Sequence, residues 1–290
     1  MAVDLAETQA ELEQLKADYD DLRLLYEAMI EHGEAVEDQL AEKNRLLEST
    51  QARLEAELGD ATRYVFSILP ERRTVSPVTD WLLVPSTELG GDSFCYHQID
   101  DEHFAFYLLD VCGHGVGAAL LSVSVINVLR ASALGRVDFR DPAGVLTALN
   151  NTFPMEKQNN MFFTIWYGVY NKTTGKLRYS TGGHPPAILI RPDAVEPELL
   201  ITNDGIAIGS IPDFKYEVEE TTVHNGDRLL IISDGTFEVD GPDGAMLTVE
   251  ALAKYVMSSD ASPEQILAWV RQVSNNSILP DDFSLVAVSF

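Results

Sequence analysis

Cysteine, basic side chains and long apolar runs are all scarce in this sequence, and each scarcity excludes a class of protein. The 290 residues include only two cysteines, Cys95 and Cys112, too few for a disulfide framework or a four-cysteine metal site. No run of about 18 or more apolar residues occurs, so no membrane-spanning helix is predicted. The N-terminus lacks the basic start and apolar stretch of a secretory signal. We therefore expect a cytoplasmic protein with reduced thiols.

Basic residues are outnumbered by acidic ones, with 20 Lys and Arg against 46 Asp and Glu and a net charge of −26. Residues 1–60 alone carry 17 acidic and 5 basic side chains. Neither this part nor the rest offers the basic surface that contacts a phosphate backbone, so nucleic acid is not an expected partner. An anionic membrane surface is excluded for the same reason. Most of the carboxylates keep the surface soluble, and a few are candidates for binding cations.

Proline is absent from residues 4–60, where apolar residues recur at alternating spacings of three and four from Leu5 to Leu54. Eleven of the 15 positions in this seam are apolar. Such a heptad repeat predicts a coiled coil, here over residues 1–61, with interruptions at Gly33 and Lys43. We expect a homodimer through residues 4–58. The alternative, an amphipathic helix folded back on its own domain, is disfavoured because the helix is too long for most globular cores.

From about Tyr64 onward glycine, proline and aromatic residues appear, and short β-rich runs alternate with turn signals, which predicts a second domain over residues 62–290. Strands are predicted at 81–85, 103–111, 161–170, 176–181, 187–190, 227–233 and 283–290. Helices are predicted at 117–133, 141–153 and 263–275. The segment NKTTGK at 171–176 joins two strand-like runs as a hairpin turn would. The pattern indicates an α+β domain in which helices cover antiparallel sheets.

Several aspartates share an unusual context, because each ends or precedes an apolar run beside glycine or another acid. They are Asp92 in ELGGDSF, Asp110 in FYLLDVCGHG, Asp234 in LLIISDGTFE, and the pair Asp281 and Asp282 in LPDDFSLVAV. If these strand ends converge, their like charges are costly unless cations neutralise them. All-oxygen ligands suit Mg²⁺ or Mn²⁺ rather than Zn²⁺. Two such ions would activate water and hold a phosphoryl oxygen.

Taken in order, the motifs GGD, DVxGHG, GGHPP, SDGxxE and the terminal DD resemble those of the SpoIIE/RsbU branch of the metal-dependent (PPM-class) protein phosphatases. The resemblance covers about residues 62–290. It implies an α-β-β-α sandwich, in which two stacked antiparallel sheets are flanked by helices on both outer sides. It also implies two Mn²⁺ or Mg²⁺ ions and the removal of phosphate from serine or threonine.

The resemblance further implies roles for individual residues. Its metal ligands would be Asp92, Asp110, the carbonyl of Val111, Asp234 and Asp281, with Asp282 as the alternative to Asp281. Asp110 would bridge both ions and would be catalytic. His114 is the second catalytic candidate, either as a proton donor to the leaving serine oxygen or as a group that holds the shape of the metal loop. Cys95, where the branch commonly has an acid, is interpreted as a buried small side chain, and His184 as structural.

The resulting hypothesis is a protein serine/threonine phosphatase that is regulated through its N-terminal coiled coil. The resemblance implies a phosphorylated protein substrate, an anti-sigma-factor antagonist of the STAS type or a similar signalling protein. The sequence leaves open whether an upstream sensor lies in the same chain or in another protein. The alternatives are a dimeric signalling scaffold that has lost catalysis and a metal-dependent hydrolase of small phosphate esters. Ligand type alone does not separate Mg²⁺ from Mn²⁺.

Overall fold

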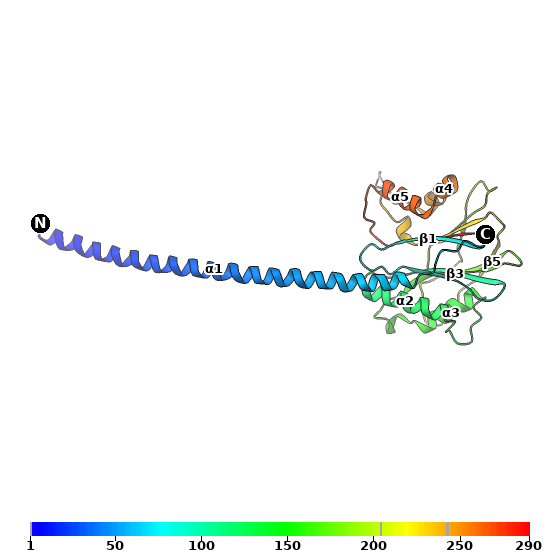
Figure 1. The fold of residues 1–290 in the computed structure, drawn as a ribbon, viewed down its shortest axis with the longest axis horizontal. Helices are drawn as coiled ribbons and strands as arrows, with labels where there is room; N and C mark the ends of the chain where they lie inside the picture. Colours follow the sequence, from blue (N-terminus) through cyan, green and yellow to red (C-terminus); the bar gives the residue numbers. More distant parts are fainter. Residues whose placement is uncertain (1, 204, 242–243) are drawn as a thin grey trace. The chain divides into compact units, whose positions relative to one another are not determined.

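The computed structural model describes residues 2–203, 205–241 and 244–290, and the chain separates into two compact units, Met1–Gly59 and Asp60–Phe290. Helix α1 spans Ala2–Ser67 (Figure 1). The long N-terminal helix expected from the heptad repeat is thereby confirmed. None of the helices in the described part of the chain is both long enough and apolar enough to cross a membrane.

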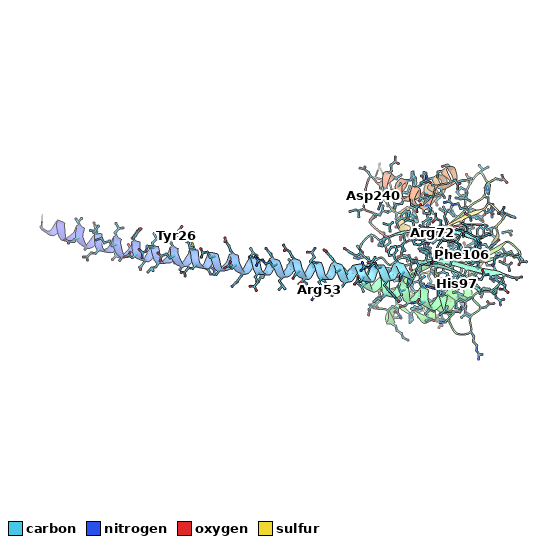
Figure 2. All side chains as sticks on the ribbon, in the orientation of Figure 1. Tyr26, Arg53, Arg72, His97, Phe106 and Asp240 are labelled. Carbon is cyan, nitrogen blue, oxygen red and sulfur yellow. The ribbon has the colours of Figure 1, made fainter. Side chains whose placement is uncertain are left out.

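The apolar seam of α1 is open to solvent within its own unit. Leu15, Leu22 and Met29 are each more than 60% exposed, and Leu40 and Leu54 at least half exposed. Figure 2 shows side chains such as those of Tyr26 and Arg53 projecting from the helix. A helix in a protein draws most of its stability from packing an apolar face, and within this unit the seam of α1 is not packed against anything described.

The second unit contains two antiparallel five-stranded sheets among the residues described. The first has the strand order β1-β10-β9-β6-β7, formed by Val78–Val84, Phe283–Ser289, Arg228–Ile232, Ala187–Ile190 and Glu198–Leu200. The second has the order β2-β3-β4-β5-β8, formed by Ser93–Gln98, His103–Val111, Phe163–Asn171, Lys176–Gly182 and Glu219–Thr222.

Helices cover the outer face of each sheet, which gives the predicted α-β-β-α order of layers. Figure 1 shows α2 and α3 on one side and α4 and α5 on the other. These helices span Val116–Arg130, Pro142–Thr152, Val249–Ser259 and Pro263–Ser274. Two short 3₁₀ helices, η1 at Met155–Lys157 and η2 at Asp234–Thr236, complete the helical elements described. The expected fold class is confirmed.

Three apolar clusters fill the spaces between the layers, and β3 contributes to two of them. Phe106 and Leu108 face the other sheet, whereas Tyr107 and Leu109 face α2 and α3. A strand buried on both faces reads as a continuous apolar run rather than an alternating one. The polar Asp110 at the end of this run is therefore the point at which the strand leaves the core.

The sequence patterns missed β2, β7, β8 and α4. Strand β8, EETT, is an edge strand with little buried surface, so it lacks apolar alternation. Strand β2, SFCYHQ, carries polar residues even though Ser93 and Cys95 are buried. Its place beside β3 is fixed by packing against α2, which local propensity does not reveal.

Candidate active site

The site begins with Asp110 at the end of β3. In the ladder between β3 and β4, Asp110 lies directly opposite Thr164. The next residues, Cys112 to Gly115, form a loop in which Gly113 and Gly115 have φ values of 86° and 87°. Glycine adopts this conformation without the steric cost that a side chain brings. The chain thereby turns directly from the carboxylate at the strand end into α2.

Two acids from the other sheet face Asp110 across a cavity of about 340 Å³. Asp234 opens η2 immediately after β9, and Asp281 lies two residues before β10. The residues that line the cavity are Ser86, Asp110, Cys112, Gly113, His114, Phe162, Thr164, Asp234, Pro280 and Asp281. Strand ends far apart in the sequence therefore meet at one end of the sandwich.

Asp92 and Asp282 lie behind this cavity, where both are almost fully buried. One carboxylate oxygen of Asp282 accepts hydrogen bonds from the backbone N–H of Ser86 at 2.7 Å and from its hydroxyl at 2.9 Å. The other oxygen faces the backbone N–H of Asp92 at 3.4 Å. Asp282 thus holds two loops together, whereas its neighbour Asp281 faces the cavity.

Two glycines of the GGD segment make this close approach sterically possible. A side chain on Gly90 would overlap the carboxylate of Asp282, and one on Gly91 would lie 2.5 Å from the carbonyl oxygen of Val111. The loop that carries Asp92 is therefore pressed against both the β3 end and the β10 start. The Val111 carbonyl, predicted as a metal ligand, faces this loop.

The pKa values of three of these aspartates reflect burial and mutual repulsion. Burial, followed by the charges of Asp234 and Asp281, raises the pKa of Asp110 to about 7. Burial and the charge of Asp110 raise the pKa of Asp92 well above its ordinary value. Burial, then Asp281 and Glu238, raise the pKa of Asp234. Each carboxylate resists losing its proton because the others lie nearby.

The chemistry of these donors fits hard divalent cations. The Oδ2 atom of Asp92 is buried and has no hydrogen-bond partner among the described residues, as expected of an oxygen that a cation would satisfy. Across residues 2–203, 205–241 and 244–290, no three acidic, histidine or cysteine side chains lie close enough together to hold a metal ion.

The two histidines singled out from the sequence lie in different environments. His114 is exposed and lines the cavity. His184 is buried, and its Nδ1 lies 2.8 Å from the hydroxyl of Thr164. Burial lowers the pKa of His184 to about 3, which is opposed only in part by the backbone at Ile232. A neutral His184 therefore lies behind the cavity-lining Thr164.

Three cavity residues were not anticipated from the sequence: Ser86, Thr164 and Phe162. Each lies beyond or at the beginning of a strand, where only the pairing register brings it to the site. Cys95, by contrast, is buried in the cluster between the second sheet and α2 and α3, and does not line the cavity.

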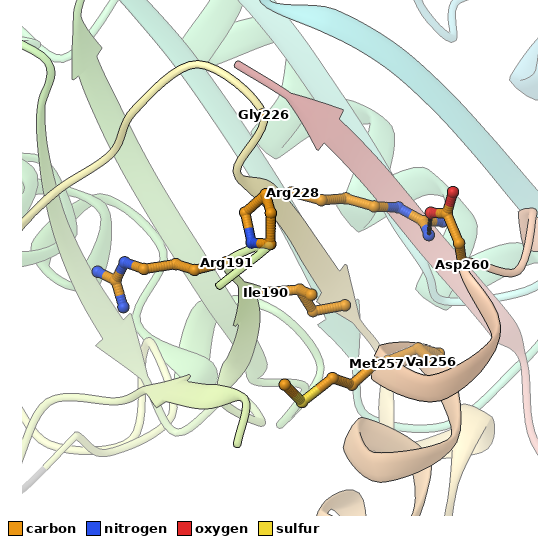
Figure 3. A pocket seen from close by; sticks show the side chains of 8 residues that line it. Ile190, Arg191, Gly226, Arg228, Val256, Met257 and Asp260 are labelled. Carbon is orange, nitrogen blue, oxygen red and sulfur yellow. Dashed lines mark hydrogen bonds and ion pairs between the residues drawn. The ribbon is translucent and has the colours of Figure 1, made fainter. Parts of the chain in front are cut away.

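A second pocket of about 270 Å³ lies beside β6, β9 and α4 (Figure 3). Its two arginines extend in different directions, Arg228 towards Asp260 at 3.1 Å and Arg191 towards Glu198. Because acids already neutralise both guanidinium groups, this pocket is a poor site for a phosphate. The acid-lined cavity remains the better candidate.

Known proteins share this architecture. The PP2C domain of SiaA from Pseudomonas aeruginosa superposes with a TM-score of 0.71 at 20% identity, covering 83% of this chain and 98% of that domain. The phosphoserine phosphatase RsbU of Bacillus subtilis is 26% identical over 277 residues, covering 92% of this chain and 78% of RsbU. Protein IcfG of Synechocystis is 23% identical over 232 residues, covering 70% of this chain. The match spans only 36% of IcfG.

The fold is the one found in PP2C phosphatase domains. The model of the stage II sporulation protein E (SpoIIE) family matches residues 100–290. The chain belongs to the SpoIIE family. The family and fold expected from the five sequence motifs are therefore confirmed.

Repulsion at the site predicts how the stability of the protein depends on pH when divalent ions are removed. The folded protein retains a proton at Asp110 up to about pH 7, whereas the unfolded chain releases it near pH 4. The free energy of unfolding should therefore fall as the pH rises from about 4 to about 7. Asp110→Asn removes this charge and should stabilise the EDTA-treated protein, on the order of 2 kcal/mol at pH 8.

Thermal unfolding at pH 5 and pH 8 measures this effect. The gain from Asp110→Asn should be larger at pH 8. Asp193→Asn, which removes an exposed carboxylate on a distant loop, provides the control and should change little. Equal gains at the two pH values would contradict the proposed cause.

Proposed function

We propose that this chain is a divalent-metal-dependent phosphatase of phosphoserine and phosphothreonine in proteins. The observation that carries the proposal is the convergence of Asp110, Asp234 and Asp281 on one cavity, with Asp92 buried behind it. Family membership supports the same activity, as does the name of RsbU, a phosphoserine phosphatase. The substrate we propose is an anti-sigma-factor antagonist of the STAS type or a similar signalling protein.

The residues of such a site would have three roles: binding the cations, positioning the loops and donating a proton. Asp92, Asp110, Asp234, Asp281 and the Val111 carbonyl would hold Mg²⁺ or Mn²⁺. Bound there, the cations would make a water molecule more acidic and neutralise charge on the phosphoryl oxygens. Asp282 positions the Ser86 and Asp92 loops and is not proposed as a ligand. His114, exposed at the cavity wall, can donate a proton to the departing serine or threonine oxygen.

Thr164 is a positioning residue in this scheme. Thr164 lines the cavity and pairs with Asp110 on the adjacent strand, and its hydroxyl lies within hydrogen-bond distance of the neutral His184. This pair fixes a hydrogen-bonding group at a defined place beside the carboxylates. The GGHPP motif thereby obtains a physical role, because it carries the histidine that holds the threonine in place.

The end of α1 provides a physical route for regulation within the second unit. The Thr62 hydroxyl donates a 2.7 Å hydrogen bond to the carbonyl of Glu88, four residues before Asp92. Arg130, the last residue of α2, donates to the carbonyl of Ile68 at 3.0 Å. We propose that pairing of α1 with a second copy biases this helix end and, through it, the loop that carries Asp92.

The activity is tested by dephosphorylation of a phosphoserine STAS-domain protein with Mn²⁺, with Mg²⁺ and with EDTA. Turnover should require the cation, and Asp281→Asn should lower kcat/KM at least about 100-fold or raise the Mn²⁺ requirement by a similar factor. Asp282→Ala should instead lower the free energy of unfolding by about 1–3 kcal/mol, because it leaves buried backbone donors unpaired. Full activity in EDTA would overturn the proposal.

The role of Thr164 predicts a difference between two small substitutions. Thr164→Val keeps the shape and removes the hydroxyl, so kcat/KM should fall by roughly 10- to 100-fold. Thr164→Ser keeps the hydroxyl and should retain most of the activity. Steady-state kinetics at saturating Mn²⁺ makes the comparison. Equal loss in both variants would indicate that packing alone matters at this position.

The coiled-coil proposal predicts that substitutions on the seam act differently from substitutions off it. Leu22→Asp places a charge on the seam and should raise the dimer dissociation constant at least about tenfold. Leu24→Asp is the matched control, because Leu24 lies on the opposite face and is similarly exposed, at 60% against 65%. Analytical ultracentrifugation measures the mass. If pairing regulates the site, only Leu22→Asp should also change the rate of dephosphorylation.

A further inference from the structure

The solvent-facing side of α2 is unusual for a surface helix in so acidic a chain. The helix sequence VGAALLSVSVINVLR contains no charged residue before Arg130, although the chain has 46 acidic and 20 basic residues. Val116 and Leu120 lie one turn apart on the same face and are 48% and 63% exposed. Their neighbours Ala118, Ala119 and Leu121 are buried against the sheet.

The first turn of α2 lies close to the cavity wall, because a side chain on Gly117 would stand 3.8 Å from the sulfur of Met161, the neighbour of the cavity-lining Phe162. Val116 follows His114 by two residues, and His114 lines the cavity together with Phe162. Phe162 is held against the same loop, because its N–H points to the Cys112 sulfur at 3.2 Å and its carbonyl accepts from the Cys112 N–H at 3.0 Å. Phe162 is itself 36% exposed. Val116, Leu120 and Phe162 together form what we call the docking face.

Exposed apolar side chains on an uncharged surface are typical of the central part of a protein interface. Among the described residues that line the cavity, none is a lysine or an arginine, so the cavity wall has no permanently cationic side chain that would recognise an acidic segment beside the phosphate. Contacts outside the cavity must therefore distinguish one phosphoprotein from another. The docking face is the apolar surface that borders the cavity.

We propose that the docking face binds the phosphoprotein substrate through apolar side chains that flank its phosphorylated serine or threonine. The inference rests on the proposed phosphatase function and adds the chemistry of the substrate surface. While the phosphate enters the acid-lined cavity, neighbouring apolar residues of the substrate pack on Val116, Leu120 and Phe162. A free phosphate ester has no such residues and gains nothing from this face.

The position of the face favours the substrate over a second copy of the chain as its occupant. A copy seated on Leu120 and Phe162 would stand beside the cavity and obstruct a protein substrate. The chain already presents a separate apolar seam along α1 for self-association. A substrate that reaches the cavity, in contrast, must pass next to the docking face.

The test compares two substrates on the full-length protein loaded with Mn²⁺, a phosphoserine STAS-domain protein and para-nitrophenyl phosphate. Leu120→Glu places a charge on the docking face at a position exposed enough to tolerate it. It should lower kcat/KM for the phosphoprotein at least about tenfold and leave kcat/KM for the aryl phosphate within about twofold. Leu120→Met keeps the apolar contact and should behave like the wild type with both substrates.

Ser124→Glu is the matched control, because Ser124 is exposed one turn further along the same face of α2. It introduces the same charge away from the cavity and should leave both rates near those of the wild type. Equal losses with both substrates for Leu120→Glu, or no loss with the phosphoprotein, would overturn the inference. A changed molecular mass for Leu120→Glu would assign the face to a second copy and would also overturn it. If the wild type turned over neither substrate, the proposed phosphatase function itself would be contradicted.

Discussion

Repulsion between carboxylates that the fold forces together is the constraint on which the rest of the site depends. Asp92, Asp110, Asp234 and Asp281 come from both sheets, and burial removes much of the water that would otherwise screen the first three. A protein gains nothing in stability from such a cluster. In the function proposed above, cations would offset this cost, because their charge would turn the repulsion into binding energy.

The scaffold around these acids is built to hold them despite that repulsion. Gly90 and Gly91 allow the Asp92 loop to press against Asp282 and the Val111 carbonyl, which no larger residue would permit. Asp282 ties this loop to Ser86 through its carboxylate. Behind the cavity, His184 is neutral and adds no charge of its own. The packing and hydrogen bonds of the site therefore hold the carboxylates together against their mutual repulsion. Such a cost to stability is expected at a functional site.

The parts of this arrangement that were visible in the sequence are those with a local signature. Asp234 ends an apolar run beside Gly235, and Asp110 ends one three residues before Gly113, so both could be picked out without a structure. Thr164 could not, because its role arises from the register that places it opposite Asp110 on a neighbouring strand. The choice between Asp281 and Asp282 was also beyond the sequence, because it depends on which side of the chain faces Ser86. Strand β2 was missed because its burial comes from α2 and not from its own pattern.

The adjacent pair Asp281 and Asp282 shows how closely backbone direction and chemistry are coupled in this fold. The two acids lie just before β10, and their side chains have different environments: Asp281 lines the cavity, and Asp282 accepts hydrogen bonds from Ser86. A slip of β10 by a single residue against β1 and β9 would move both aspartates away from these positions. Ser86 would then lose its hydrogen bonds to Asp282, and the cavity would lose the carboxylate of Asp281. A working site therefore depends on the correct alignment of β10.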